Sequence, residues 1–558
     1  MKENRVLIVM QSVTVKIDGI TKSYPYGISY YEISRDFDKK RHNKILAVKI
    51  NNELISLDKK CYHDCTIEFI DVNDQNGYKM YQAALKFIFI VAVKEVFPTA
   101  KVTFEHSVPK GILAKVDGVL IEQLDVSKIK GKMASIVAED YRLEKLNIYK
   151  KDAINYYEEQ HESEKAKNIY SKSFDIVNLY RLKEELNYFY TELPYSTGAI
   201  DKFEIKYIND QYFVLLCPSQ RTNGNIPEYV HYQNIIDSFL EGKQWLEKVQ
   251  VPYLSDLNSL IATHQIKDFI EACELTFNER ICECANTICE KEEIKIVLIA
   301  GPSSSGKTTT TKRLSSYLKA RGYDPIQIST DDYFVDRNKS PKNEKGEYDF
   351  ECLQAIHLDE FNKDLNDLIN GKEITLPVYN FVEGKGKKGN KKIKLKDNSI
   401  ILIEGLHCLN DDLTPHVHNR YKYKIYLSPF IPLNIDPHNY ISTLDLRLLR
   451  RIVRDFRTRG VPVADTIASW QLVRDGEEKY IFPYIHQADV IINTALAYEV
   501  NVLKVFVEPL LYSVTYESSY YEEARRLIKF LKRFYPITSE YVAGSSILRE
   551  FIGWKGDF

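Results

Sequence analysis

The sequence predicts a multidomain chain whose amino-terminal part is α+β and whose second half is α/β. The chain has 558 residues, which is too many for one hydrophobic core and indicates roughly three or four domains. Short runs of alternating apolar and polar residues fill residues 11–70, as in a small β-rich module. Strand and helix patterns then alternate over residues 292–500, which favours a parallel sheet with helices on both faces.

The amino-terminal part divides into two predicted domains and a connector. Residues 1–72 form the β-rich module, with strands at 13–17, 45–50, 53–57 and 65–70. Residues 73–227 form an α+β domain, with helices at 78–97, 127–146 and 151–164 and strands at 100–104, 118–124, 203–209 and 211–216. Residues 228–291 are charged and helical, mainly at 232–246 and 256–289, and are predicted to connect this part to the second half.

The second half is predicted to hold an α/β domain at 292–500 and a mostly helical tail at 501–558. The candidate strands of the α/β domain are 294–300, 325–329, 399–404, 423–427 and 489–493. A lysine-rich stretch at 385–396 predicts an exposed hairpin. The tail has a helical pattern at 521–534, and we expect its last apolar run, 547–553, to pack against another domain.

Composition and charge limit the function classes. The net charge of -2 gives no electrostatic reason for bulk attraction to nucleic acid or to a membrane surface. No window approaches the roughly 18 unbroken apolar residues of a membrane-spanning helix. Nine irregularly spaced cysteines are typical of a reducing compartment, so we expect a cytoplasmic protein without a disulfide framework. The cysteine spacing also lacks the paired pattern of a zinc site.

A complete phosphate-binding loop lies between the first predicted strand of the α/β domain and the helix that follows it. Gly301, Gly306, Lys307 and Thr308 complete the pattern G-x-x-x-x-G-K-[ST]. The glycines let successive backbone N–H groups point at phosphate oxygens, the lysine adds positive charge, and the threonine hydroxyl is placed to ligate Mg²⁺. The predicted nucleotide-binding residues are Gly301, Pro302, Ser303, Ser304, Ser305, Gly306, Lys307, Thr308 and Thr309.

Two acidic residues follow other strands of the same predicted sheet. Asp331 comes directly after strand 325–329, together with Asp332. Phosphate transfer to an alcohol requires a carboxylate that orients the hydroxyl and accepts its proton, and Asp331 is the candidate; the alternative is that the pair caps a turn. Glu404 ends strand 399–404 beside the phosphate loop, where it is the second candidate Mg²⁺ partner with Thr308; the alternative is a solvated glutamate.

An arginine-rich helix is predicted at 445–460. Arg447, Arg451 and Arg454 are spaced i, i+4 and i+7, which places their guanidinium groups on one face. Few acidic residues accompany them, so like charges crowd together unless an anion lies among them. We therefore predict a lid that holds the triphosphate and the transition state of its transfer. An RNA-binding stripe is the alternative use of such a helix.

A further stretch supplies candidate substrate contacts. Asp349, Tyr379 and Phe381 combine aromatic rings with a carboxylate, a set that can stack a base and hold ribose hydroxyls. Aromatic residues of a hydrophobic core give a similar pattern, so the residues alone leave both interpretations open.

Taken together, these motifs resemble the uridine kinase/phosphoribulokinase family over residues 292–500, in the order in which that family has them. The resemblance implies that Asp331 is the general base, that Asp349 binds ribose and that Tyr379 and Phe381 line a nucleoside pocket. It implies further that Glu404 belongs to the metal strand and that Arg451, Arg454 and Arg459 are lid and substrate arginines.

The chain departs from the uridine–cytidine kinases of this family at two positions. Gly384 replaces a base-reading histidine, and Val461 replaces an arginine just after the lid glycine. These departures put selectivity for pyrimidines in doubt but not the class of reaction.

The amino-terminal part resembles threonyl-tRNA synthetase over roughly residues 11–225. There a ubiquitin-like TGS module, which has a β-grasp fold, precedes an editing-type domain; the local similarity is at 92–98 and 104–107. The resemblance implies a TGS-like module at 1–72 and an editing-like domain at 73–227. The editing family has an H-x-x-x-H helix, whereas the matching helix at 77–87 has no histidine, and His106 alone cannot build a metal site. Hydrolytic editing is therefore not expected.

The sequence thus predicts a P-loop kinase that uses ATP or GTP with Mg²⁺ and phosphorylates the 5′-hydroxyl of a nucleoside such as uridine or cytidine. Asp331, Lys307, Arg451 and Arg454 would act in catalysis, and Asp349, Tyr379, Phe381 and Arg459 would bind the substrate. Two alternatives are a sugar-phosphate kinase of the phosphoribulokinase type and an RNA- or tRNA-associated regulatory NTPase. The expected partners are the nucleoside and the nucleoside triphosphate, with no membrane; RNA binding by the amino-terminal region and a homo-oligomer are left open.

Overall fold

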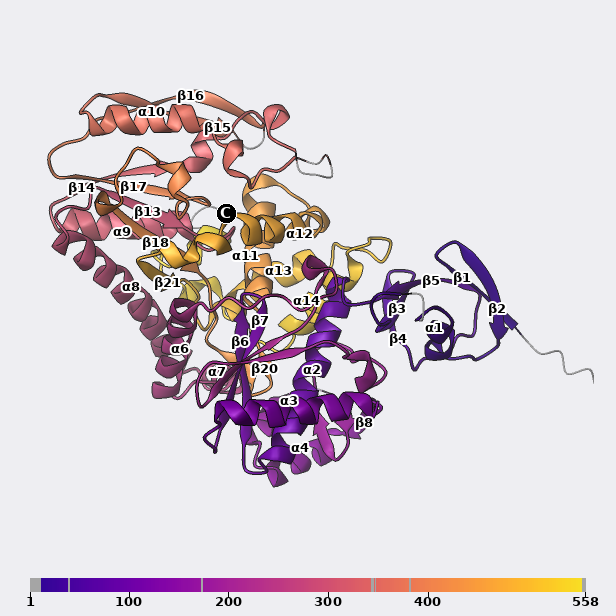
Figure 1. Cartoon of the computed structure of the whole chain (residues 1–558). Helices are drawn as coiled ribbons and strands as arrows, with labels where there is room; N and C mark the ends of the chain where they lie inside the picture. The colour runs from indigo at the N-terminus through magenta and orange to yellow at the C-terminus, as the bar shows by residue number, and fades with distance from the viewer. Residues whose placement is uncertain are drawn as a thin grey trace, which may run out of the picture.

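The computed structural model describes residues 12–38, 41–171, 174–342, 346, 348–380 and 383–553. Figure 1 shows a small module at one side of the molecule, attached to a larger body in which the rest of the chain packs together. None of the described helices is both long and apolar enough to cross a membrane.

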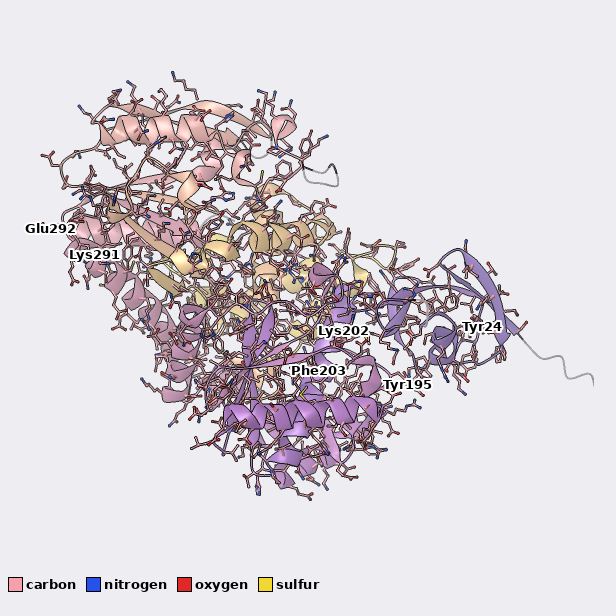
Figure 2. The ribbon with its side chains drawn as sticks, in the orientation of Figure 1. Tyr24, Tyr195, Lys202, Phe203, Lys291 and Glu292 are labelled. Carbon is pink, nitrogen blue, oxygen red and sulfur yellow. The ribbon has the colours of Figure 1, made fainter. Side chains whose placement is uncertain are left out.

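The projecting module is a mixed sheet crossed by one helix. Its elements are β1 Ser12–Ile17, β2 Ile20–Pro25, α1 Tyr30–Asp38, β3 Ala47–Ile50, β4 Glu53–Ser56 and β5 Cys65–Ile70. The strand order is β2-β1-β5-β3-β4, in which only β1 and β5 are parallel. This order is compatible with the predicted β-grasp, although the TGS identity stays a prediction. The module meets the body where Tyr31 stacks on Tyr195, with ring centroids 3.8 Å apart; Figure 2 labels Tyr195 on the side of the body that faces the module.

The second region packs two antiparallel sheets around α2 (Gln75–Val96), whose buried residues run almost unbroken from Met80 to Val93. The first sheet has the order β11-β12-β7-β6 and the second β10-β9-β8. The other elements are β6 Lys101–Val108, β7 Gly111–Asp117, α3 Gln123–Ala138, β8 Glu144–Tyr149, α4 Lys150–Glu159, α5 Ser163–Tyr170, β9 Ile176–Leu182, β10 Glu185–Asn187, β11 Glu204–Tyr207 and β12 Tyr212–Leu216.

Two sequence predictions in this region were wrong. The strand expected at 118–124 lies earlier, as β7, because it pairs with β6 through a tight turn at Pro109 and Lys110. The helix expected at 127–146 ends at Ala138, and β8 follows it. The residues of β8 alternate between partly buried and exposed, which is the period of a strand rather than of a helix.

Three helices connect the second region to the second half: α6 Gln233–Lys248, α7 Leu254–Ala262 and α8 Ile266–Glu290. The single helix expected at 256–289 is therefore two, and the break falls at His264, which has a positive φ of 60°. Figure 2 labels Lys291 and Glu292 at the end of α8, where the chain enters the second half.

The second half is built on the predicted parallel sheet. All five strands are parallel in the order β14-β17-β13-β18-β21: β13 Ile296–Ala300, β14 Asp324–Ser329, β17 Ser399–Gly405, β18 Lys422–Ser428 and β21 Val490–Asn493. Every residue of β13, the central strand, is buried. Helices cover both faces of the sheet. On one face, α8 and α9 (Lys307–Ala320), which lie side by side in Figure 1, pack with Val297 and Ile299; on the other, α6 and α10 (Leu358–Ile369) pack with Ile296 and Leu298. The predicted α/β architecture is confirmed.

The second half contains further elements outside this sheet. They are α9 Lys307–Ala320, α10 Leu358–Ile369, β15 Ile374–Asn380, β16 Lys385–Ile393, β19 Asn434–Asp436, β20 Asn439–Tyr440, α11 Thr443–Arg459 and α12 Val463–Tyr480. Strands β15 and β16 form the expected exposed hairpin. The tail consists of α13 Glu499–Leu511, α14 Tyr521–Leu531 and α15 Arg549–Ile552, and α13 runs across the domain boundary predicted at 500.

The amino-terminal region and the second half share buried contacts. The short hairpin of β19 and β20 is inserted against the second region, where the Pro437 carbonyl accepts from Phe104 N at 2.8 Å. Asn434 Nδ2 donates to the Phe104 carbonyl at 3.0 Å, and Lys86 Nζ donates to the His438 carbonyl at 3.1 Å. Because these polar groups are buried and satisfied only by one another, the two regions are fixed relative to each other.

Candidate active site

The phosphate loop connects β13 to α9 in the conformation that its glycines allow. Gly306 has a φ of +87°, which disfavours any residue with a side chain. A Cβ there would also lie 2.4 Å from Cδ1 of Ile547, in the carboxyl-terminal tail. Lys307 Nζ donates across the loop to the carbonyls of Gly301, at 2.8 Å, and Pro302, at 3.3 Å. The loop is therefore a closed turn with Lys307 folded along it.

Two buried arginines of α11 hold the loop from outside the site. Arg447 Nε donates to the Ser303 carbonyl at 3.0 Å, and Arg450 Nη1 donates to the Ser304 carbonyl at 3.1 Å. Each arginine also pairs with a buried carboxylate, Glu477 on α12 for Arg447 and Glu499 on α13 for Arg450. The spacing predicted that Arg447 would face the cavity together with Arg451 and Arg454. It does not, because its guanidinium binds the Ser303 carbonyl and Glu477.

A cavity of about 1030 Å³ opens at the carboxyl ends of the strands, beside the loop. Parallel α/β sheets bind their ligands at this edge. The cavity brings together most of the predicted site residues: Ser303, Ser304, Ser305, Gly306, Lys307, Thr308, Asp331, Asp349, Tyr379, Glu404, Arg451, Arg454 and Arg459. Gly301, Pro302 and Thr309 do not line it, and Phe381 lies outside the described residues.

The side chains of Thr308 and Glu404 meet at the floor of the cavity. Thr308 Oγ1 donates to Glu404 Oε1 at 2.8 Å. The pKa of Glu404 is raised to about 7, chiefly by burial; Lys307 opposes this shift and the nearby Asp331 adds to it. Near neutral pH this carboxyl group is therefore close to its point of protonation, and an added cation would favour its charged form.

The donor set at this point fits Mg²⁺. A hydroxyl and a carboxylate are hard oxygen ligands, and Mg²⁺ is usually held by one or two such protein groups together with phosphate oxygens and water. The described residues contain no cluster of three or more His, Cys, Asp or Glu side chains that could hold a metal by themselves. Thr308 and Glu404 would hold the ion, whose chemistry is to neutralise charge on the phosphates.

Asp331 and Asp332 separate at the end of β14. Asp331 lines the cavity, with its backbone N–H held by Ser329 Oγ at 3.3 Å. Asp332 points elsewhere, and its Oδ1 accepts from Tyr379 N on β15 at 3.5 Å. One carboxylate of the pair is thus directed into the cavity, while the other fixes the strand that carries Tyr379.

The predicted arginines Arg451, Arg454 and Arg459 gather around one carboxylate. Ion pairs join Asp455 to Arg451 Nε at 3.2 Å, to Arg454 Nη2 at 2.8 Å and to Arg459 Nη1 at 3.5 Å. Arg451 Nη1 also donates to Ser303 Oγ of the phosphate loop at 3.1 Å. One negative charge among three guanidinium groups leaves the wall of the cavity positive, so it attracts an anion.

The opposite wall supplies groups suited to an acceptor. Tyr480 Oη donates to Asp349 Oδ2 at 2.6 Å, and the ring of Tyr379 meets that of Phe334 edge-on, with centroids 5.7 Å apart. Gly384 has a φ of +67°, and a Cβ there would lie 2.9 Å from Arg337. A histidine at position 384 would therefore be strained in this structure.

Sequence reasoning missed several titratable residues that line the cavity, among them Glu351 and His407. The pKa of Glu351 is raised to about 7, chiefly by burial and next by Glu477, while Arg451 and Lys307 oppose the shift. Burial lowers the pKa of His407 to about 4, although the backbone of Glu351 and Cys352 opposes the shift. The sequence signal for His407 was its position, three residues after Glu404 and just beyond the strand predicted at 399–404.

Comparison with known proteins shows what the part of the chain that carries this site is similar to. Residues 296–500 match the model of the Phosphoribulokinase / Uridine kinase family. A uridine kinase from Anoxybacillus flavithermus is 26% identical over 198 residues, which cover 35% of this chain and 84% of that protein. A solved structure described as a possible uridine kinase from Bacillus stearothermophilus covers 38% of this chain and 98% of its own, at 21% identity. The TM-score of this match is 0.27.

The amino-terminal part has a different relative. A threonine–tRNA ligase from Acetivibrio thermocellus is 25% identical over 209 residues, which are 37% of this chain and 32% of the ligase. The chain thus spans about a third of that relative. Taken with the phosphate loop and the parallel sheet, the match over residues 296–500 supports a P-loop kinase domain in this part of the chain, similar to the Phosphoribulokinase / Uridine kinase family.

Proposed function

We propose that the domain transfers the γ-phosphate of ATP or GTP, with Mg²⁺, to the 5′-hydroxyl of a nucleoside. The observation that supports this proposal is the single cavity that Lys307, Asp331 and Asp349 all line. It has a phosphate-binding loop at one side, an acidic and aromatic wall at the other, and a positive wall between them. This is the arrangement needed to bring a triphosphate and an alcohol together.

Each group would act by position and charge. Lys307 and the phosphate loop would hold the β- and γ-phosphates, while Arg451 and Arg454 would offset the charge that develops during transfer. Asp331 would orient the acceptor hydroxyl and receive its proton. Asp349 and Tyr379, with Phe381 and Arg459, would bind the nucleoside. The uridine kinase relative supports a nucleoside acceptor, and Gly384 and Val461 leave the choice of base open.

The amino-terminal regions are proposed to be a TGS-like module at 1–72 and a degenerate editing-like domain at 73–227, joined through a connector at 228–291 to the kinase domain at 292–500 and the tail at 501–558. The threonine–tRNA ligase match and the strand order of the module support this division. His106 is buried, and its Nε2 lies 2.6 Å from Thr443 Oγ1 at the start of α11. Its surroundings therefore favour a structural role.

The direct test is a panel of nucleosides incubated with labelled ATP or GTP and scored for monophosphate product. We expect product from uridine or cytidine, and at least a 100-fold loss of rate in Asp331→Asn and in Lys307→Ala. Asp332→Asn is the matched control for Asp331→Asn, because Asp332 is its neighbour but bonds to β15. Full activity in Asp331→Asn would remove the proposed base, and no product from any nucleoside would remove the proposed acceptor.

A further inference from the structure

The carboxyl-terminal tail reaches the phosphate loop and bonds to it. Glu550, on α15, lines the cavity, and its Oε2 accepts from Thr309 N at 3.2 Å and from Thr309 Oγ1 at 2.7 Å. Ile547, which is fully buried, fills the space beside Gly306. A segment more than 200 residues away in sequence thus covers the first turn of α9.

Helix α11 holds the tail in this position. Arg457 Nε donates to the Phe551 carbonyl at 3.1 Å, and Arg457 Nη2 donates to the Glu550 carbonyl at 3.3 Å. The Arg450 guanidinium lies over the Phe551 ring, 4.8 Å from its centroid. The tail is therefore attached both to the loop and to the helix whose arginines face the cavity.

The bond to Thr309 occupies a donor that a nucleotide requires. The first backbone N–H groups of a helix after a phosphate loop have no partner within the helix, and they bind phosphate oxygens. Thr309 is the third residue of α9, so its N–H is one of these groups. A carboxylate and a phosphate cannot accept from it together, and their negative charges repel.

We propose that Glu550 is a built-in competitor for the phosphates of the nucleotide. A triphosphate can bind fully only when the Glu550 carboxylate leaves Thr309, so the tail sets the affinity of the site. This inference rests on the proposed function, in that it takes the loop to bind a nucleoside triphosphate. The apparent affinity equals the intrinsic affinity multiplied by the fraction of molecules in which Thr309 is released.

The test is the dissociation constant of ATP with Mg²⁺, measured by titration calorimetry on the full chain without any acceptor. Glu550→Ala removes the acceptor, and Glu550→Gln keeps its size but removes its charge. We expect both variants to bind ATP about tenfold more tightly than wild type, since a hydrogen bond to a charged group is released. Glu540→Gln is the control, because Glu540 is an exposed carboxylate of the same tail.

Hydrogen exchange gives an independent readout in the unaltered protein. If ATP displaces Glu550, backbone amides at 546–552 exchange faster when ATP is bound, whereas those of α9 exchange more slowly. Unchanged or weaker ATP binding in both Glu550 variants, or slower exchange at 546–552 with ATP, would overturn the inference. Phosphorylation of nucleosides is scored separately. Tighter ATP binding in the Glu550 variants without any monophosphate product would support Glu550 as a competitor but remove the proposed nucleoside acceptor. Monophosphate product with unchanged ATP binding in the variants would support the acceptor but remove the competitor.

Discussion

Helix α11 carries two sets of arginines that differ in burial and in partner. Arg447 and Arg450 are buried, and each has a glutamate of its own on a neighbouring helix. Arg451 and Arg454 line the cavity and share the single carboxylate of Asp455. The first set fixes the phosphate loop through its carbonyls, and the second leaves positive charge facing the cavity. Arginines of one helix thus have two roles, to support the phosphate loop and to make the cavity positive. The buried glutamates of α12 and α13 decide which arginines take the supporting role.

The largest effect is expected from breaking the supporting set. Arg450→Met would leave Glu499 buried without a partner, which costs about 3–5 kcal/mol and lowers the thermal midpoint of unfolding. Replacing both partners, as Arg450→Met with Glu499→Leu, should recover part of that loss, because no charge is then left unpaired. Calorimetric melting of the two variants measures the difference. Equal midpoints for wild type and Arg450→Met would show that the buried pair does not support the domain.

The cavity-facing set should show the opposite balance of effects. Arg454→Met is expected to slow phosphate transfer at least 100-fold, equal to about 2.7 kcal/mol in the barrier, because charge on the transferred group is no longer offset. Its stability should change by less than about 1 kcal/mol, since the guanidinium is only partly buried. Steady-state rates and melting on the same samples separate the two quantities. A large fall in stability would place Arg454 with the supporting set.

A smaller effect, dependent on pH, is expected from Glu351. Its folded pKa of about 7 lies above the ordinary glutamate value, so folding favours the protonated form. The stability from this group is complete below pH 4 and is lost as the pH rises through 7. Glu351→Gln should therefore be more stable than wild type at pH 8, by about 1–3 kcal/mol, and should match it at pH 4. Melting at both pH values measures this, and a difference independent of pH would contradict it.

The sequence predicted those parts of the site that depend on local chemistry. The loop from Gly301 to Thr308 needs glycines and a lysine in fixed order, and the strands at 294–300 and 399–404 are largely apolar, so both can be recognised in the sequence itself. The strand at 118–124 was misplaced by several residues because short apolar runs do not fix their own register.

The amino-acid sequence by itself therefore determined a parallel sheet, a phosphate loop and acidic residues at the strand ends, because these features depend on periodicity and on short motifs of neighbouring residues. Only the tertiary structure decided that Arg447 supports the loop rather than facing the cavity, that Glu351 and His407 enter the site, and that Glu550 bonds to Thr309. Burial and long-range contacts fix a side chain's partner and charge, and neither follows from spacing along the chain.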